Sequence, residues 1–323
     1  MKRAVLSPEF TVPSLGTLLP RWPGRTVELD GTATFVRDTP ATSSTAEPAL
    51  YVHGLGGSSS NWTDLAGLLA GAGPLDGQAI DLPGFGHSGP AHSYTIAAMA
   101  ERVIRWIEHS DRGPVHLFGN SMGGAVTVKV AGTRPDLVRT LTLISPAMPF
   151  LDPRRSVQGR IVPLAFLPRA PRLMARRMAT MPPSEVAEMV IDACFADPSL
   201  IPDQRREEAI EEAKLRSSVP WYADAYVRSL RGLVSSFLRA YLPGEGSIWR
   251  CTAKITAPSL VIAGRQDRLV DIRVAPQVAR MIPDSRLLML EGVGHVAQME
   301  SPRTVARAFL GMLAETRQAD MAS

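Results

Sequence analysis

Short apolar runs alternate with helical patterns along most of this chain. Strand-like runs are found at 49–53, 78–82, 115–118 and 138–145, and helical periodicity at 61–70, 94–109 and 122–133. This alternation is typical of a parallel sheet with helices on both faces. Ahead of it, residues 26–37 alternate around Asp30-Gly31, a dipeptide that favours a two-residue hairpin. We therefore expect the sheet to begin with an antiparallel pair.

The alternation stops after Pro146 and resumes near the C-terminus. A strand is predicted at 259–264, a helix from about Asp271, a strand at 286–290 and a last helix from Ser301-Pro302, where serine at the N-cap and proline at the first helical position indicate a helix start. Between the two blocks, helical patterns cover 184–195, 203–217 and 221–241, an insertion too long for a loop. We predict an irregular N-terminal arm at 1–25, a core at 26–146 and 251–318, and a helical cap at 147–250.

The segment Gly119-Asn120-Ser121-Met122-Gly123 joins a strand-like run to a helical one. A sharp turn between strand and helix leaves no room for side chains beside the central residue, which accounts for the flanking glycines. Such a turn raises the Ser121 hydroxyl above the strand ends. It also points the free N–H groups and the positive dipole end of the helix at whatever the serine attacks. Ser121 is therefore the predicted nucleophile.

A serine hydroxyl is a weak nucleophile at neutral pH, so Ser121 needs a base and a third group that orients the base. His295 follows the final predicted strand and is the candidate base. The orienting acid is expected after another strand, between Ser121 and His295 in the chain. Asp267 meets this condition. Asp271, a candidate N-cap, and Asp152, at the start of the predicted cap, are the alternatives.

The other five histidines fit structural roles better. His53 and His87 lie in glycine-rich loops, which we expect them to stabilise, although His87 is the second candidate for the base. His92, His109 and His116 fall in a predicted loop, a helix end and a strand. Solvated or packed side chains account for these three.

A tetrahedral oxyanion needs two N–H donors, and the loss of one lowers the rate by about 10²–10³-fold. Met122, which follows the nucleophile, is expected to supply the first donor. The second is expected from the glycine-rich loop after the first parallel strand, where the backbone can approach a substrate closely. Leu55 is the predicted donor there, with Gly56 as the alternative.

Five motifs, taken together, resemble those of the α/β-hydrolase fold family. In chain order they are His53-Gly54-x-Gly56-Gly57, Asp81-x-Pro83-Gly84-x-Gly86-x-Ser88, Gly119-x-Ser121-x-Gly123-Gly124, Gly264-Arg265-x-Asp267 and Gly294-His295. The resemblance covers the chain apart from the N-terminal arm and the cap. It implies a mostly parallel, doubly wound sheet, a triad of Ser121, Asp267 and His295, and an acyl-enzyme intermediate that water opens.

The resemblance also narrows the reaction. Haloalkane dehalogenases and epoxide hydrolases carry Asp at the position of Ser121, so attack on a carbonyl is favoured. The elbow is similar to that of carbon-carbon hydrolases of meta-cleavage products. Those usually have Trp after the catalytic His and a Gly-Pro pair in the oxyanion loop, where this chain has Val296 and Gly56-Gly57. The perhydrolases share the elbow but generally have a smaller cap.

We therefore predict a carboxylesterase-like or lipase-like serine hydrolase for carboxylic esters or thioesters with an apolar portion. A carbon-carbon hydrolase is the alternative. A second alternative is a non-catalytic ligand-binding protein on the same fold.

The composition adds few constraints. With 323 residues, 45% hydrophobic and 20% charged, the chain resembles an ordinary soluble enzyme, and a net charge of +4 does not indicate a nucleic-acid partner. Two widely spaced cysteines, Cys194 and Cys251, favour free thiols over a disulfide or a zinc site, and no metal or cofactor is expected. No signal peptide or membrane-spanning stretch is apparent, which favours a cytoplasmic location. The oligomeric state is left open.

The predicted cap combines apolar and basic residues. One helical face carries Trp221, Tyr222, Tyr226, Leu230, Leu233 and Phe237. Packing onto the sheet domain is the first interpretation of this face, and a hydrophobic pocket or lipid-facing lid is the second. A group of arginines precedes it: Arg154, Arg155, Arg160, Arg169, Arg172, Arg176 and Arg177. A solvated helix accounts for them, and weak contact with an anionic membrane surface or an acidic substrate group is the alternative.

Overall fold

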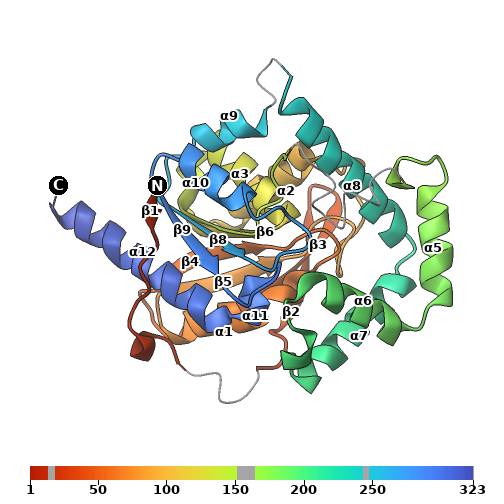
Figure 1. Cartoon of the computed structure of the whole chain (residues 1–323), viewed down its shortest axis with the longest axis horizontal. Helices are drawn as coiled ribbons and strands as arrows, with labels where there is room; N and C mark the ends of the chain where they lie inside the picture. Colours follow the sequence, from red (N-terminus) through yellow and green to blue (C-terminus); the bar gives the residue numbers. More distant parts are fainter. Residues whose placement is uncertain (14–18, 151–163, 243–246, 323) are drawn as a thin grey trace.

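A nine-stranded sheet crosses the molecule (Figure 1), with strand order β1-β9-β8-β7-β6-β4-β5-β3-β2. The computed structural model describes residues 1–13, 19–150, 164–242 and 247–322. The strands are β1 (Lys2–Arg3), β2 (Gly24–Leu29), β3 (Thr32–Thr39), β4 (Glu47–Val52), β5 (Leu75–Ile80), β6 (Val115–Asn120), β7 (Val138–Ile144), β8 (Ser259–Gly264) and β9 (Ser285–Leu290).

Most of the sheet is parallel, as the alternating pattern predicts. Strands β5, β4, β6, β7, β8 and β9 pair in parallel, whereas β2 and β3 form an antiparallel hairpin that continues antiparallel to β5. Asp30 and Gly31 both have positive φ at the tip of this hairpin, which confirms the predicted two-residue turn. Every residue of β6 and of β8 is buried, because helices cover both faces of the sheet there.

Neighbouring residues of β6 point to opposite layers of the core. Leu117 joins the apolar cluster on the face covered by α2 (Ile96–Ser110), α3 (Met122–Thr133), α9 (Ile248–Ala253) and α10 (Val274–Met281). Phe118 joins the cluster on the other face, covered by α1 (Thr63–Gly71), α11 (Ala297–Glu300) and α12 (Pro302–Ala322). Figure 1 shows these two helical layers on either side of the sheet. The period of two along a strand accounts for the division.

Among the described residues, four further α-helices lie between β7 and β8 in the sequence and gather at one side of the molecule (Figure 1). They are α5 (Ala170–Thr180), α6 (Pro183–Cys194), α7 (Asp203–Ser218) and α8 (Tyr222–Arg239). The last three correspond to the helical patterns in the sequence. Tyr222 of α8 packs edge-on against Phe85 of the core, with ring centroids 5.9 Å apart. The apolar face of α8 therefore packs onto the sheet domain, the first interpretation given above.

The arginine group of this region is only partly within the described residues. Arg169 and the three arginines of α5, which are Arg172, Arg176 and Arg177, are exposed. Arg154, Arg155, Arg160 and the alternative acid Asp152 lie outside the described residues. None of the described helices is long and apolar enough to cross a membrane.

The N-terminal segment is more ordered than the predicted irregular arm. Lys2–Arg3 forms β1, which pairs in parallel with β9. Arg307 of α12 then donates to the carbonyl of Ser7 at 2.8 Å, and Arg303 donates to that of Glu9 at 2.8 Å. The pairing of β1 covers the edge of β9, and the two arginine bonds hold the following segment against α12. The proline-rich composition did not indicate this pairing, because it depends on a strand some 280 residues away, a separation of long range in any chain.

Candidate active site

Ser121 lies at the turn between β6 and α3 with φ 55° and ψ −120°. A non-glycine residue at positive φ is strained and persists only where its surroundings hold it. The Ser121 N–H donates to the carbonyl of Ile144 at 3.0 Å. A Cβ on Gly123 would clash with the carbonyl oxygens of Val52 and His53. The strained turn and its obligatory glycine have the geometry expected of a nucleophile elbow.

Asp267 and His295 form a buried pair at the ends of β8 and β9. Nδ1 of His295 donates to Oδ2 of Asp267 at 2.9 Å, and the two side chains are 4% and 2% exposed. The N–H groups of Leu269 and Val270 donate to the same carboxylate at 2.8 and 3.0 Å. Burial acts to raise the pKa of Asp267, but His295 and these two N–H groups outweigh it and lower that pKa. The charged carboxylate holds the proton on Nδ1 and leaves Nε2 to accept one.

Asn120 ties the elbow to the histidine loop. Its side-chain amide donates to the carbonyl of His295 at 3.2 Å and to that of Ile144 at 3.0 Å. Because β6, β8 and β9 run in parallel, Ser121, Asp267 and His295 all follow the carboxyl ends of strands at one edge of the sheet. The alternative acid Asp271 instead forms an ion pair with Arg273 at 2.6 Å.

The glycine-rich loop after β4 lies against the nucleophile. A Cβ on Gly54 would be 3.0 Å from the Cβ of Ser121, and Gly56 has φ 76°. The loop closes through a hydrogen bond of 3.0 Å from the Gly57 N–H to the Gly54 carbonyl. Within the described part of the chain, the backbone N–H groups of Leu55 and Met122 have no acceptor. Both remain the predicted oxyanion donors.

His53 has the loop-stabilising geometry that the sequence predicts. Its Nδ1 donates to the Gly54 carbonyl at 2.7 Å, and its Nε2 accepts from the Leu82 N–H at 2.9 Å. Burial lowers the pKa of His53, so the ring is neutral in this arrangement. His87 stacks on Phe35, with ring centroids 4.7 Å apart. His116, predicted to be packed or solvated, is buried in the sheet.

Glu300 is a residue of this site that the sequence analysis missed. Its carboxylate accepts the Gly294 N–H at 2.9 Å and the Ala196 N–H at 2.8 Å, which joins the histidine loop to the segment after α6. The His295 N–H also donates to the Cys194 carbonyl, at 2.7 Å. A Cβ on Gly294 would be 2.5 Å from that same carbonyl oxygen. The only sequence signal for Glu300 was an acidic residue five positions after the candidate base.

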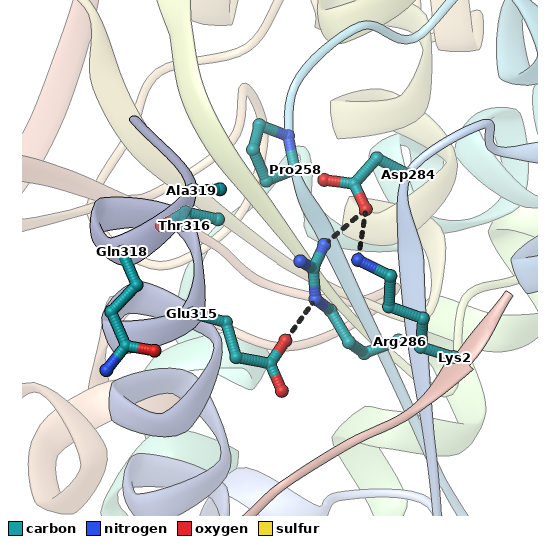
Figure 2. Close-up of a pocket in the computed structure, with 8 residues that line it drawn as sticks. All are labelled: Lys2, Pro258, Asp284, Arg286, Glu315, Thr316, Gln318 and Ala319. Carbon is teal, nitrogen blue, oxygen red and sulfur yellow. Dashed lines mark hydrogen bonds and ion pairs between the residues drawn. The ribbon is translucent and has the colours of Figure 1, made fainter. Parts of the chain in front are cut away.

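A cavity of about 460 Å³ lies at the opposite edge of the sheet, by the amino ends of β8 and β9 (Figure 2). Arg286 projects into it and pairs with Asp284 at 2.7 Å and with Glu315 of α12 at 2.9 Å. Lys2 of β1 adds a longer pair with Asp284, at 3.8 Å. The charges compensate one another, so this cluster joins β1, β9 and α12 and does not form a second reactive centre.

Comparison with known proteins identifies the family. The family model for the alpha/beta hydrolase fold matches residues 48–302. The chain belongs to the α/β-hydrolase fold family. The acetyltransferase component (dihydrolipoyllysine-residue) of the acetoin cleaving system of Pseudomonas putida is 30% identical over 270 residues, or 82% of this chain and 63% of the relative. The chain thus spans less than two thirds of that protein.

A second group of relatives is named for lipase activity. Monoacylglycerol lipase ABHD6 of Bos taurus is 26% identical over 278 residues, or 84% of this chain and 76% of the relative. Among solved structures, a bacterial membrane phospholipase A superposes with a TM-score of 0.73 at 24% identity, over 92% of this chain and 87% of that one. At that identity the superposition shows the fold alone.

Proposed function

We propose that this α/β-hydrolase-fold protein is a serine hydrolase that cleaves carboxylic esters or thioesters with an apolar portion. In this proposal Ser121 is the nucleophile, His295 the base and Asp267 the orienting acid. The observation that carries it is the Ser121 elbow at φ 55° on the same sheet edge as the buried pair of His295 and Asp267. A strained serine on the same sheet edge as an imidazole fixed by a carboxylate is the arrangement that acyl transfer requires.

The reaction follows from these positions. Nε2 of His295 takes the proton of Ser121 as the hydroxyl attacks the carbonyl carbon, and the oxyanion is held by the N–H groups of Leu55 and Met122. The imidazolium then protonates the leaving alcohol or thiol, which leaves an acyl ester on Ser121. Water attacks this ester, with His295 again acting as base, and restores the free serine. The Asp267 carboxylate stabilises the imidazolium in both steps.

Two observations support an apolar substrate portion. The relatives include monoacylglycerol lipases, and Tyr222 and Tyr226 of α8 lie against Gly56 beside the elbow. Aromatic side chains at this place would contact the acyl or alcohol group of a bound ester.

Weak peripheral contact with lipid belongs to the same proposal. Leu164, Phe166, Leu167 and Leu173, at and before α5, are 46–60% exposed and lie close in sequence to exposed arginines. Such a basic and apolar surface favours anionic lipid. Sedimentation with vesicles that contain an anionic phospholipid, at low salt, tests it. Recovery of all the protein in the supernatant would refute the contact.

The decisive experiment compares the wild type with Ser121→Ala. We expect a fluorophosphonate probe to label only the wild type, and turnover of p-nitrophenyl esters of graded acyl length to vanish in the variant while its circular dichroism stays unchanged. Wild-type turnover by Ser121→Ala would refute the assignment. Labelling without ester turnover would favour the carbon-carbon hydrolase, and stoichiometric ligand binding without labelling would favour a binding protein.

A further inference from the structure

The inner face of α7 lies over the loop that is predicted to hold the oxyanion. Glu212 of α7 is buried, and its Oε1 accepts the Ser60 hydroxyl at 3.1 Å. Ser60 belongs to the short 3₁₀ helix η2 (Ser59–Trp62), which directly follows Gly56-Gly57. Arg216 lies four residues after Glu212, and residues at this spacing share one face of a helix. Arg216 therefore projects from α7 on the side that faces this loop.

Two tyrosines of α8 reach the same place. From the position of a Cβ on Gly56, the Tyr222 hydroxyl oxygen is 3.3 Å away and the Tyr226 ring is 3.1 Å away. The rings lie with their centroids 6.2 Å apart, and that of Tyr222 rests on Phe85. Neither hydroxyl has a hydrogen-bond partner among the residues that the structure describes. Two free phenol groups thus stand beside the predicted oxyanion donor.

Arg216 is a half-buried cation without a partner in the described part of the chain. No carboxylate lies within ion-pair distance of it there, and the Glu212 carboxylate is engaged by Ser60. The groups that act most strongly on its charge are Tyr222, Glu212, Cys194 and Tyr226. Burial acts to lower the pKa of Arg216, but these groups raise it, so the guanidinium stays charged. An unpaired charge in a partly dry site is costly unless a ligand compensates it.

The neighbours of the Arg216 guanidinium connect it with the predicted catalytic residues. Cys194, one of its neighbours, accepts the His295 N–H through its carbonyl, and Tyr222 contacts the glycine loop on the other side. Arg216 therefore lies between the loop of the base and the loop of the oxyanion. An anionic group bound there would be part of the same molecule that places its carbonyl at Ser121.

We propose that Arg216 and the hydroxyls of Tyr222 and Tyr226 form an anion-binding subsite, and that the substrate is an ester with a carboxylate or phosphate group near the scissile carbonyl. This inference rests on the proposed function. Guanidinium binds carboxylate and phosphate through two parallel hydrogen bonds, and the phenols add two more donors. A subsite of this kind distinguishes the anionic ester from its neutral analogue.

The test uses two matched substrate pairs. The mono-p-nitrophenyl ester of glutaric acid is compared with p-nitrophenyl valerate, which has the same chain length without the carboxylate. A 1-acylglycerol 3-phosphate is compared with the monoacylglycerol of the same acyl group. A preference within the first pair places the anion on the acyl side, and a preference within the second places it on the alcohol side. We expect the wild type to prefer the anionic member of one pair in kcat/KM.

Arg216→Met is the informative variant, because it keeps the unbranched apolar part of the side chain and removes the charged guanidinium. We expect kcat/KM for the preferred anionic ester to fall about 10–100-fold, as for loss of a charged hydrogen bond, with the neutral ester little changed. Arg280→Met, at an exposed arginine of α10, is the matched control and is expected to change neither. Tyr222→Phe and Tyr226→Phe are expected to give a smaller loss of kcat/KM for the anionic ester. Should Arg216→Met fold poorly, Arg216→Lys replaces it and is expected to give a partial loss.

The outcomes separate the two proposals. Equal kcat/KM for the anionic and neutral members of both pairs, with Ser121 labelled and the neutral esters hydrolysed, would overturn the anion subsite and leave the hydrolase standing. Equal losses on anionic and neutral esters in the folded Arg216 and tyrosine variants would overturn it as well. No labelling of Ser121 and no turnover of any of the four substrates would overturn the proposed function, and this inference with it.

Discussion

Asp267 is the residue whose contribution to catalysis can be separated most cleanly from its contribution to the stability of the fold. It accepts three donors: the imidazole of His295 and the backbone N–H groups of Leu269 and Val270. Its lowered pKa means that it is charged throughout the neutral range. In the proposed mechanism this charge sets which nitrogen of His295 carries the proton.

Asp267→Asn removes the charge and nearly preserves the shape. We expect kcat for a p-nitrophenyl ester to fall by about 10³–10⁴-fold, because an amide no longer holds the proton on Nδ1 of His295. Steady-state kinetics measure this loss, and an unchanged melting temperature would show that the fold is intact.

Asp271→Asn is the matched control, since Asp271 was the alternative acid and is also buried. It pairs with Arg273 and not with His295, so we expect stability to change and kcat to stay within a few-fold. A larger loss of kcat in Asp271→Asn than in Asp267→Asn would contradict the assignment.

For single residues, the sequence predicts a catalytic role where the immediate neighbours in the chain define the local structure. Ser121 is recognisable because the flanking glycines are a local steric requirement, and His295 and Asp267 because each follows a strand. Arg216 and Glu300 were not singled out. The position of Arg216 depends on how α7 packs, and the partners of Glu300 come from two segments more than 90 residues apart in the chain, a tertiary arrangement that no local pattern encodes.

Among the elements, α11 and the end of α6 are joined through Glu300. Glu300→Gln replaces one acceptor oxygen by an NH₂ group, which cannot accept from the N–H of Gly294 or Ala196. We expect one of these bonds to be lost, the histidine loop to shift, and kcat to fall about 10-fold, since misplacement of a catalytic group by 1 Å costs up to about 10²-fold.

The rate of fluorophosphonate labelling and the split between kcat and KM measure this effect. Glu291→Gln, an exposed neighbour that pairs with Arg265, is the control and is expected to leave both unchanged. A Glu300→Gln variant with a lowered melting temperature but wild-type kcat would assign Glu300 a structural role only.

The elements that the sequence predicted are those with a strong pattern of their own. Helices α6, α7 and α8 and the parallel strands lie within a few residues of their expected bounds. Helix α5 was given no bounds, although a solvated helix was the first interpretation of its arginines. Ala170 is its one buried residue, so little of the helix is marked as facing the core. Strand β1 has two residues, and α9 has six. Segments as short as these carry too few positions for a period to emerge.

For the molecule as a whole, buried histidines set the response to acid. His116 is fully buried and bonds to Glu47 at 2.8 Å and to Thr140 at 2.8 Å. Burial lowers the pKa of His116 in spite of Glu47. In the unfolded chain the same ring has a pKa near 6.5. The unfolded state therefore binds the proton first, and stability is lost as the pH falls below that value.

We expect the free energy of unfolding to fall between pH 7 and pH 5, with a limiting slope of about 1.4 kcal/mol per pH unit from His116 alone. Urea unfolding at a series of pH values measures it. The decline is expected to be shallower in His116→Gln, whose side chain does not titrate. His109→Gln, at an exposed histidine, serves as the control, and profiles of equal slope in the wild type and His116→Gln would refute the prediction.

The pairing of β1 with β9 has a consequence for the order of assembly. Lys2–Arg3 precedes the other strands of this sheet in the chain, yet their partners, Arg286 and Leu287, are made only after the other strands of the sheet. The contacts of the arm with Arg303 and Arg307 come later still. Lys2–Arg3 therefore has to wait, unpaired, until β9 has been made. Closure of this edge follows the synthesis of β9, and until then the backbone groups of β1 and of β8 on that side stay open to other partners.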